Sequence, residues 1–379
     1  MVRVTAADLT AALVAIDSVN PALVPGGAGE AEIAGFLVRW AAENGLDAQV
    51  LEATPGRPSV IITARGSGGG RTLLLCGHTD TVGVDGMTAP HTPRRDGDRL
   101  YGRGTCDMKA GLAAALVAAR DAAAAGLAGD VVVACVADEE HASLGVQEAL
   151  THVRADAAII TEPTREAIIV AHKGFVWADV LVEGFAAHGS RPELGVDAIV
   201  HAGAVLTALG ALDAELIGRE PHPVLGRGSV HAGTISGGIE ASSYPGRCAI
   251  TVERRTLPGE GEATLARELE AVLERATAAQ PGLRASFALG LSREPFAIDP
   301  EHELVGLTRD AAAHELGATP ALTGAPYWTD AAFIAAAGIP ALLFGPTGEG
   351  EHALEEWVSV ASLEAVTRTL TRIATTFCA

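Results

Sequence analysis

Acidic residues and histidines gather directly after apolar segments or inside glycine-rich stretches of this chain. The residues that stand out are His78 and Asp80 in GHTDTV, Asp107 in GRGTCDMKAG, Glu139 and Glu140 in ADEEHA, Glu162 in ITEPT, and His352 in GEGEHALEE. Proteins of the α/β class bind ligands at such strand ends and loops. Imidazole and carboxylate groups suit catalytic zinc, which keeps a coordination position open for water. Each residue alone would more often be an ordinary polar loop residue, so the prediction of a metal centre depends on their combination.

The spacing of these residues suggests different roles. In an extended segment His78 and Asp80 point the same way, so the Asp80 carboxylate can accept the second N–H of the imidazole and orient it. Neighbouring Glu139 and Glu140 point apart, so one can bind metal while the other moves protons in the cleft. Asp107 has a short side chain in a glycine-rich loop, and it can offer one oxygen to each of two metal ions.

The order of these motifs resembles one known family over almost the whole chain. The matching segments are GHTDTV, GRGTCDMKAG, ADEEHASLG, ITEPT, HKGFVWADVLVEGFAAHGSRPELGVDAI, ERRTLPGE and FGPTGEGEHALEEW. They are similar to those of the di-zinc metallopeptidases and deacylases, a family that includes acetylornithine deacetylase, succinyl-diaminopimelate desuccinylase, aminoacylase and carboxypeptidase G. Any one motif would be weak, but their occurrence in this order is highly specific.

The resemblance implies two zinc ions, although ligands of these types also accept cobalt or manganese. The two ligand sets would be His78, Asp107 and Glu162 for one ion, and Asp107, Glu140 and His352 for the other. Glu139 would be the general base that activates water. Asp80 would be the acid that orients the imidazole of the first ligand set.

The resemblance also implies roles for residues of the central part of the chain. His188 of AAHGSRP would reach the active site of a partner subunit and stabilise the tetrahedral oxyanion, so catalysis would require a homodimer. Arg255 in ERRTLPG would bind a substrate carboxylate, which suits a bidentate guanidinium; Arg254 faces the other way on the same strand and is the alternative. Many relatives carry an asparagine where this chain has GGIEASSYPG, and there Ser242, beside Ser243, would be the substrate contact.

Two kinds of sequence pattern predict the elements that position these residues. Helical and strand-like patterns alternate in the first part and resume after Pro295, which is typical of an α/β layer with a central, mostly parallel sheet. The expected helices cover residues 6–17, 30–44, 109–125, 303–316, 330–337 and 362–377, and the expected strands cover 59–64, 72–77, 130–137 and 157–160. The apolar runs LLLC and VVVACVA lack polar alternation, as expected for strands buried on both faces.

The middle of the chain has a β-α-β-β-α-β order, which is that of a small ferredoxin-like α+β sandwich. Its expected helices cover residues 196–215 and 264–280. We therefore expect a zinc-peptidase-like catalytic domain over residues 1–173 and 294–379, interrupted by an inserted lid and dimerisation domain over residues 174–293.

Composition excludes several classes of partner. A net charge of −20 would repel nucleic acids and anionic membranes. The most apolar windows, residues 110–125 and 198–212, are interrupted by Arg120, Asp121 and His201, so we expect no membrane span. The amino terminus lacks a secretory signal and predicts a helix capped by Thr5. Five cysteines without a CxxC pair fit reduced thiols, so we expect a cytoplasmic protein.

Three functions fit these residues. Removal of the acyl group from a small N-acyl amino acid, as in acetylornithine deacetylase, is the first. A dipeptidase or carboxypeptidase would share every catalytic residue named above and differ only in the substrate pocket. A metal-binding protein without catalytic activity is disfavoured because Glu139 and the full ligand set are present.

Overall fold

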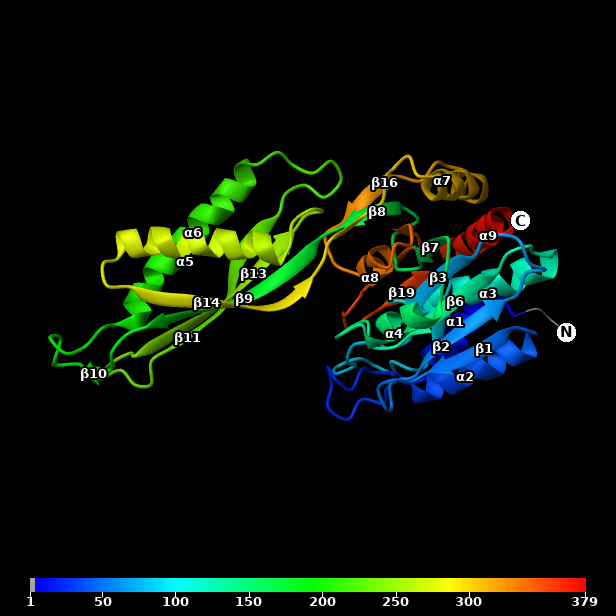
Figure 1. The fold of residues 1–379 in the computed structure, drawn as a ribbon. Helices are drawn as coiled ribbons and strands as arrows, with labels where there is room; N and C mark the ends of the chain where they lie inside the picture. Colours follow the sequence, from blue (N-terminus) through cyan, green and yellow to red (C-terminus); the bar gives the residue numbers. More distant parts are fainter. Residues whose placement is uncertain (1–3) are drawn as a thin grey trace. The chain divides into compact units, whose positions relative to one another are not determined.

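The protein is described by a computed structural model that covers residues 4–379. The chain divides into two compact units, which Figure 1 traces from the amino to the carboxyl terminus. The first unit contains the chain up to Val170 together with Ile298–Thr323 and Thr329–Ala379. The second unit contains Ala171–Ala297 and the short segment Gly324–Trp328. The chain therefore leaves the first unit after Val170, returns to it at Ile298, and leaves it a second time for the short segment Gly324–Trp328.

A large sheet forms the centre of the first unit, with strands in the order β1-β2-β6-β3-β7-β17-β8. The four strands from β6 to β17 run parallel to one another, and the strands outside them pair antiparallel. This confirms the predicted α/β class with a mostly parallel sheet at its centre. The strand bounds are β1 Asp47–Leu51, β2 Ser59–Ala64, β3 Leu73–His78, β6 Val131–Val136, β7 Ala157–Ile160, β8 Ile168–His172 and β17 Ala341–Leu343. β15 (Phe296–Ala297) and β16 (Leu322–Ala325) also pair with β8.

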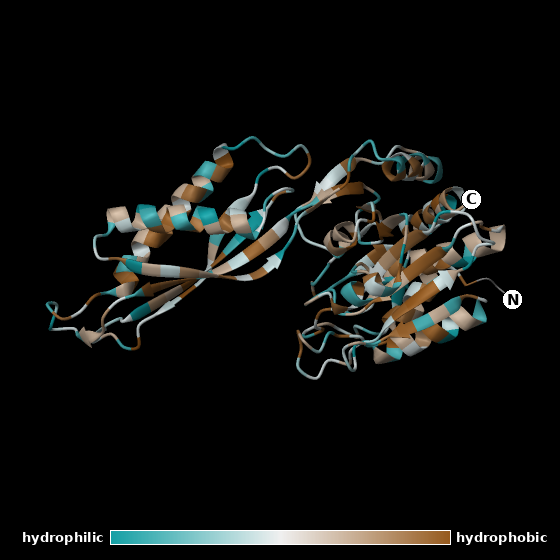
Figure 2. Cartoon of the chain, in the orientation of Figure 1, coloured by the Kyte–Doolittle hydropathy of each residue, from teal (hydrophilic) through white to brown (hydrophobic). Residues whose placement is uncertain are grey.

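The inner strands of this sheet are buried along their whole length. Every residue of β2, β3, β6 and β7 is buried, as expected from apolar runs that show no polar alternation. Figure 2 shows these strands as the most apolar part of the first unit. His78 is the last residue of β3, and the candidate acids Glu139 and Glu162 come soon after β6 and β7, so these side chains lie at the carboxyl edge of the sheet.

Seven helices of the described residues belong to the first unit. Their bounds are α1 Ala6–Val14, α2 Ala31–Glu43, α3 Lys109–Ala125, α4 Leu144–His152, α7 Glu303–Leu316, α8 Ala331–Ala336 and α9 Val360–Phe377. The predicted cap of α1 is confirmed, because the Thr5 hydroxyl accepts from the Asp8 backbone N–H. α3 contacts β3, β6, α1 and α9, so its alanine-rich surface is buried on most sides. α3 begins two residues after Asp107, so its close packing fixes the end of the loop that carries Asp107.

A small antiparallel sheet, β18-β19-β5-β4, lies beside the loops of the first unit that carry the candidate residues. Its strands are β4 Arg94–Asp96, β5 Arg99–Tyr101, β18 Gly348–Glu349 and β19 Trp357–Ser359. β5 leads into the loop that contains Asp107, while β18 and β19 flank the loop that contains His352. Pairing of β5 with β19 therefore brings together two loops separated by more than half of the chain.

The second unit has the predicted β-α-β-β-α-β order. Its elements are β9 Gly174–Glu183, α5 Ala198–Gly218, β11 Ser229–Gly237, β13 Arg247–Thr256, α6 Glu262–Ala279 and β14 Arg284–Arg293, with the short strands β10 Ala187–His188 and β12 Ser243–Tyr244. The four long strands are antiparallel in the order β11-β13-β9-β14, and both helices pack on one face of this sheet. The ferredoxin-like arrangement is therefore confirmed.

Helix α5 is the one helix of residues 4–379 that is long and apolar enough to cross a membrane by length and composition. One face of it, including Ala202, Val205 and Leu209, packs in the core of the second unit. Its other face exposes Ile199 and Val200. The apolar composition thus serves a core contact on one side and leaves an apolar surface on the other.

Candidate metal centre

The carboxylate of Asp107 lies between two imidazoles. Its Oδ1 is 3.0 Å from Nε2 of His78, and its Oδ2 is 3.5 Å from Nε2 of His352. His78 is the last residue of β3 and is buried, whereas His352 lies on the exposed loop after β18. Two oxygens of one carboxylate thus face two different histidines, which is the geometry expected of a residue that bridges two cations.

Two glutamates complete the cluster. Glu140 Oε2 is 3.1 Å from Nε2 of His352, and Glu162 Oε1 is 4.0 Å from Nε2 of His78. Ligand atoms of His78, Asp107 and Glu140 lie within 4.8 Å of one another, close enough to hold one metal ion. All five predicted metal ligands therefore meet in one place, although they come from loops spread from residue 78 to residue 352.

Charges in the cluster favour a cation. Burial disfavours the charged imidazole of His78, yet the hydrogen bond to Asp107 and the charge of Glu162 outweigh it and raise its pKa well above the usual value. Hydrogen bonds to carboxylates, first that to Asp107, raise the pKa of His352 to about 10. Burial raises the pKa of Glu139 and of Glu162 well above the usual value. The donor set thus concentrates more carboxylates than two imidazoles balance, and divalent cations would stabilise these carboxylates in their charged form.

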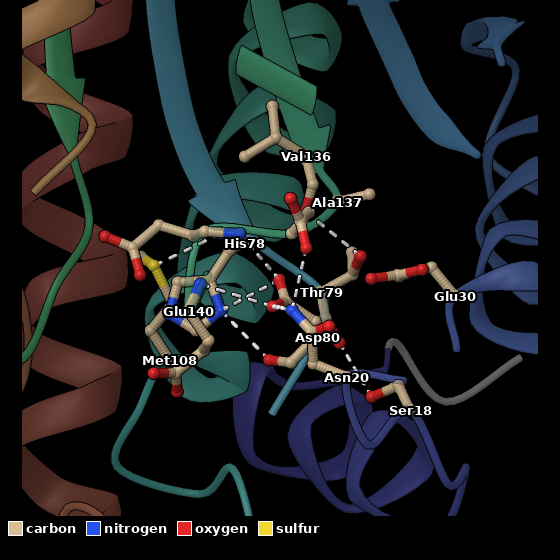
Figure 3. Close-up of polar contacts among 12 residues, drawn as sticks. Ser18, Asn20, Glu30, His78, Thr79, Asp80, Met108, Val136, Ala137 and Glu140 are labelled. Atoms are coloured by element: carbon tan, nitrogen blue, oxygen red, sulfur yellow. Dashed lines mark hydrogen bonds and ion pairs between the residues drawn. The ribbon is translucent and has the colours of Figure 1, made fainter. Parts of the chain in front are cut away.

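Asp80 makes different contacts from those predicted. The imidazole Nδ1 of His78 lies 2.9 Å from the backbone carbonyl oxygen of Asp80, and 3.7 Å from its carboxylate. The carboxylate instead accepts the backbone N–H groups of Glu139 and Glu140 at 3.1 and 3.3 Å. Figure 3 shows this residue between the end of β3 and the loop after β6. The predicted carboxylate–imidazole hydrogen bond is therefore wrong, because at this turn the backbone carbonyl is nearer to the ring.

Glu139 and Glu140 differ in their surroundings, although they are adjacent. Glu140 contacts His352, while the charges that act on Glu139 are first those of His78, then Asp330 and Glu162. Both lie in the turn after β6, and the end of β6 lies beside the end of β3 through parallel pairing. The rigid sheet thus sets where this pair of acids projects.

His188 and Ser242 lie together in the second unit. β10 pairs antiparallel with β12, and the Gly189 backbone N–H donates to the carbonyl oxygen of Ser242 at 2.6 Å. The His188 side chain is exposed, with its Nδ1 2.8 Å from the Ser190 hydroxyl oxygen. The hydroxyl of the neighbouring Ser243 donates to Glu240.

The two candidate arginines of β13 have distinct environments. The Arg254 guanidinium is fully buried and forms ion pairs with Glu260 and Glu268, so it stabilises the second unit. Arg255 faces the opposite side of the strand, is 33% exposed, and pairs with Glu253 at 2.7 Å. Its guanidinium carbon also lies 5.2 Å from the centre of the Phe175 ring. Of the two, Arg255 is the one that a solvent-borne carboxylate can reach.

A family comparison agrees with this geometry. The model of the peptidase family M20/M25/M40 matches residues 74–376. The chain belongs to this peptidase family. The predicted relationship to di-zinc metallopeptidases and deacylases is thereby confirmed, and the chain is a metal-dependent hydrolase by this membership.

Relatives of the M20 family with similar sequences carry the name acetylornithine deacetylase. That of Proteus mirabilis is 31% identical over 353 residues, which are 90% of this chain and 89% of that enzyme. That of Myxococcus xanthus is 30% identical and covers 84% of each chain, and that of Yersinia pseudotuberculosis is 30% identical over 98% of this chain and 94% of its own.

Solved structures of M20 peptidases share the fold. Aminopeptidase PepT from Bacillus cereus superposes with a TM-score of 0.78 at 21% identity, over 98% of this chain and 97% of that one. The protein YXEP of Bacillus subtilis, described as a dinuclear metal-binding peptidase of the M20 family, gives 0.74 at 16% identity, over 98% and 97% of the two chains. The whole architecture is therefore that of the M20 family.

Sequence reasoning missed an ion pair that supports the Asp107 loop of this M20 protein. The buried Glu356 carboxylate accepts from the backbone N–H groups of Gly104, Cys106 and Asp107, at 2.7 to 3.0 Å. It also pairs with Arg103 at 2.7 Å. Both residues stand inside motifs quoted for the family, GRGTCDMKAG and GEGEHALEEW, but their function follows only from the contact between the motifs.

Proposed function

We propose that this M20 protein is an amidohydrolase that removes the acyl group from a small N-acyl amino acid, with N-acetylornithine as the first substrate to test. The observation that carries the proposal is the Asp107 carboxylate, whose two oxygens face His78 and His352. Similarity to acetylornithine deacetylases over most of the chain supports the acyl amino acid.

The cluster would hold two zinc ions, with cobalt or manganese as replacements. The ligands would be His78, Asp107 and Glu162 for one ion, and Asp107, Glu140 and His352 for the other. Ions at this place supply Lewis acidity, which polarises the amide carbonyl and acidifies water at neutral pH.

The chain's own residues would move the protons. Glu139 lies at the same sheet edge as the ligands, and no ligand role is proposed for it. Its carboxylate would take a proton from the attacking water and return it to the leaving nitrogen. Asp80 would hold the Glu139 backbone through the hydrogen bond at 3.1 Å.

Residues of the second unit would contact the substrate. Arg255 would bind the α-carboxylate of the acyl amino acid, and Ser242 would add a polar contact beside it. The exposed His188 would donate a hydrogen bond to the oxyanion in the active site of a partner subunit. Pairing of β10 with β12 supports a common location for His188 and Ser242.

The homodimer would form through the second unit. β11 is an edge strand of its sheet, and its residues from His231 to Gly237 are exposed. Exposed edge strands are sites for pairing with another chain. The apolar side chains of Ile199 and Val200 on α5 and of Ile235 on β11 are exposed next to this edge, since α5 packs against β11. This surface supports a dimer, and five buried free cysteines support a cytoplasmic location.

A hydrolysis screen tests the proposal. The zinc-loaded chain would be offered N-acetyl, N-succinyl and N-carbamoyl amino acids beside dipeptides, with and without a chelator. Chelator-sensitive cleavage of N-acetylornithine above all other compounds is the expected result. Preferential cleavage of dipeptides would show that the protein is a peptidase and not a deacylase. If no compound of the panel is cleaved, the protein is a metal-binding protein without catalytic activity.

A further inference from the structure

A buried asparagine joins the candidate centre to the amino-terminal segment. The Asn20 amide nitrogen donates to Asp80 Oδ2 at 2.8 Å and to Asp138 Oδ1 at 3.0 Å, as Figure 3 illustrates for the first contact. Its amide oxygen accepts from the Ala22 backbone N–H at 2.9 Å. Asn20 is fully buried, and both of its N–H groups and its oxygen are used.

Arg57 extends this network away from the metal cluster. Its Nη2 lies 2.8 Å from Asp138 Oδ1, and its Nε and Nη2 donate to the two oxygens of Glu30 at 2.7 and 2.6 Å. The carboxylates of Glu30, Asp80 and Asp138 are all fully buried. Arg57 thus contributes the positive charge of the network, and the Asn20 amide separates the two carboxylates that it bridges.

Asp138 is the residue at which this network controls the backbone. It precedes Glu139 and has a φ of 67°, in the left-handed region that costs an L-residue free energy. Its carboxylate accepts the Ala142 N–H at 3.2 Å, and its carbonyl oxygen accepts the N–H of Ser143 at 2.6 Å. Asp138 therefore closes the turn after β6, and contacts from Asn20 and Arg57 hold it in that conformation.

We propose that Asn20, Arg57 and Asp138 are positioning residues for the general base. Together with Asp80, which accepts the Glu139 and Glu140 N–H groups, they fix the turn from both sides and set the direction of the Glu139 side chain. The inference rests on the proposed function for the role of Glu139. Misplacement of a reacting group by about 1 Å can lower a rate by about 100-fold.

Replacing Asn20 with leucine tests the proposal, because the two side chains have the same branching and the same number of heavy atoms. Asn20→Leu removes both donors, while Asn44→Leu is the matched control, because the Asn44 amide donates to the Trp40 carbonyl at the end of α2. With zinc-loaded protein and N-acetylornithine, we expect Asn20→Leu to lower kcat by about 100-fold and to change KM by less than about 3-fold. The control is expected to keep wild-type values.

A double-mutant cycle separates positioning from general damage. If Asn20 acts through Glu139, adding Asn20→Leu to Glu139→Gln lowers kcat no further. Multiplicative losses in the double variant, or a single Asn20→Leu variant with wild-type kcat, would overturn the proposal. Should Asn20→Leu fail to fold by thermal melting, Arg57→Lys takes its place in the same cycle.

Amide hydrogen exchange gives a readout that does not depend on activity. The Glu139 and Glu140 N–H groups are expected to exchange at least about 10-fold faster in Asn20→Leu and at the wild-type rate in Asn44→Leu. Unchanged exchange at these two N–H groups overturns the positioning role, even if the protein hydrolyses no amide substrate of the panel. Faster exchange in Asn20→Leu, found together with a wild-type protein that hydrolyses none of the substrates, would keep the positioning role and refute the proposed function alone.

Discussion

At the scale of residues, two adjacent glutamates have different surroundings. Glu140 contacts His352, whereas Glu139 makes no such contact and lies among the charges of His78 and Glu162. The difference follows from the turn after β6, whose N–H groups are held by Asp80. Chemical identity alone does not distinguish the two side chains, but their directions do.

The general base is tested by Glu139→Gln. The amide keeps the shape of the side chain but cannot take a proton, so kcat is expected to fall by about 100-fold to 10,000-fold. Metal content, measured by elemental analysis, should match the wild type, because Glu139 is not among the proposed ligands. Near-normal turnover, or loss of metal, would contradict the assignment.

At the scale of elements, the small sheet β18-β19-β5-β4 and the Arg103–Glu356 pair hold two loops together. The Arg103 guanidinium donates to the carbonyl oxygens of Gly83 and Ala353 at 3.1 and 2.9 Å, while its other nitrogen pairs with Glu356. Ala353 follows His352 directly. This pair therefore sets the separation of the loops that carry Asp107 and His352.

Glu356→Gln should loosen this arrangement. The neutral amide loses the buried ion pair and turns an N–H group toward backbone donors, so unfolding in urea should show a loss of about 3 kcal/mol. Zinc affinity, measured by competition with a chelator, is expected to fall about 10-fold to 100-fold because the supporting contacts of a ligand are lost. The exposed neighbour Glu355→Gln is the control, and equal effects of both changes would argue against the role of the pair.

Two glycine-to-alanine substitutions, one on α3 and a control on α5, test the packing of α3. A Cβ at Gly111 would lie 1.7 Å from the Thr161 carbonyl oxygen, and backbone atoms there cannot yield without moving β7. Gly111→Ala is therefore expected to destabilise the protein by about 3 kcal/mol or more. Gly203→Ala on α5 meets no atom within 4 Å and should be neutral or stabilising by up to about 1 kcal/mol. Thermal or urea unfolding that ranks the two variants the other way round would show the packing to be wrong.

At the scale of the whole molecule, one domain carries the cluster and the other carries His188 and Arg255. The second unit is a complete ferredoxin-like sandwich with its own core, so it can serve as a separate binding and dimerisation body. We propose that a second copy of this chain covers its exposed edge strand and the apolar surface of α5.

Complementation tests whether a partner subunit completes the site. Glu139→Gln and His188→Ala are each expected to be inactive as homodimers. Coexpressed, they form mixed dimers in which one of the two sites has both residues intact, so roughly a quarter of wild-type activity should return. Size-exclusion chromatography with light scattering checks the dimer itself. If no activity returns although mixed dimers form, His188 does not act across the interface.

Much of this protein could be predicted without coordinates. Uninterrupted apolar runs required strands buried on both faces, and the β-α-β-β-α-β order required the ferredoxin-like sandwich, because periodicity along the chain reports which face an element buries. The types and loop contexts of His78, Asp107 and His352 predicted their convergence, since ligands gather at the ends of parallel strands.

Tertiary structure alone decided which groups support those ligands. The contacts of Asn20 with Asp138, and of Arg103 with Glu356, span 118 and 253 residues. No local pattern records such a contact, because an isolated arginine or asparagine looks the same whether it is solvated or buried against an acid. The Asp80 carboxylate shows the same limit. Its spacing from His78 predicted a hydrogen bond to the imidazole. In the folded chain the imidazole contacts the backbone carbonyl of Asp80, and the carboxylate accepts the N–H groups of Glu139 and Glu140.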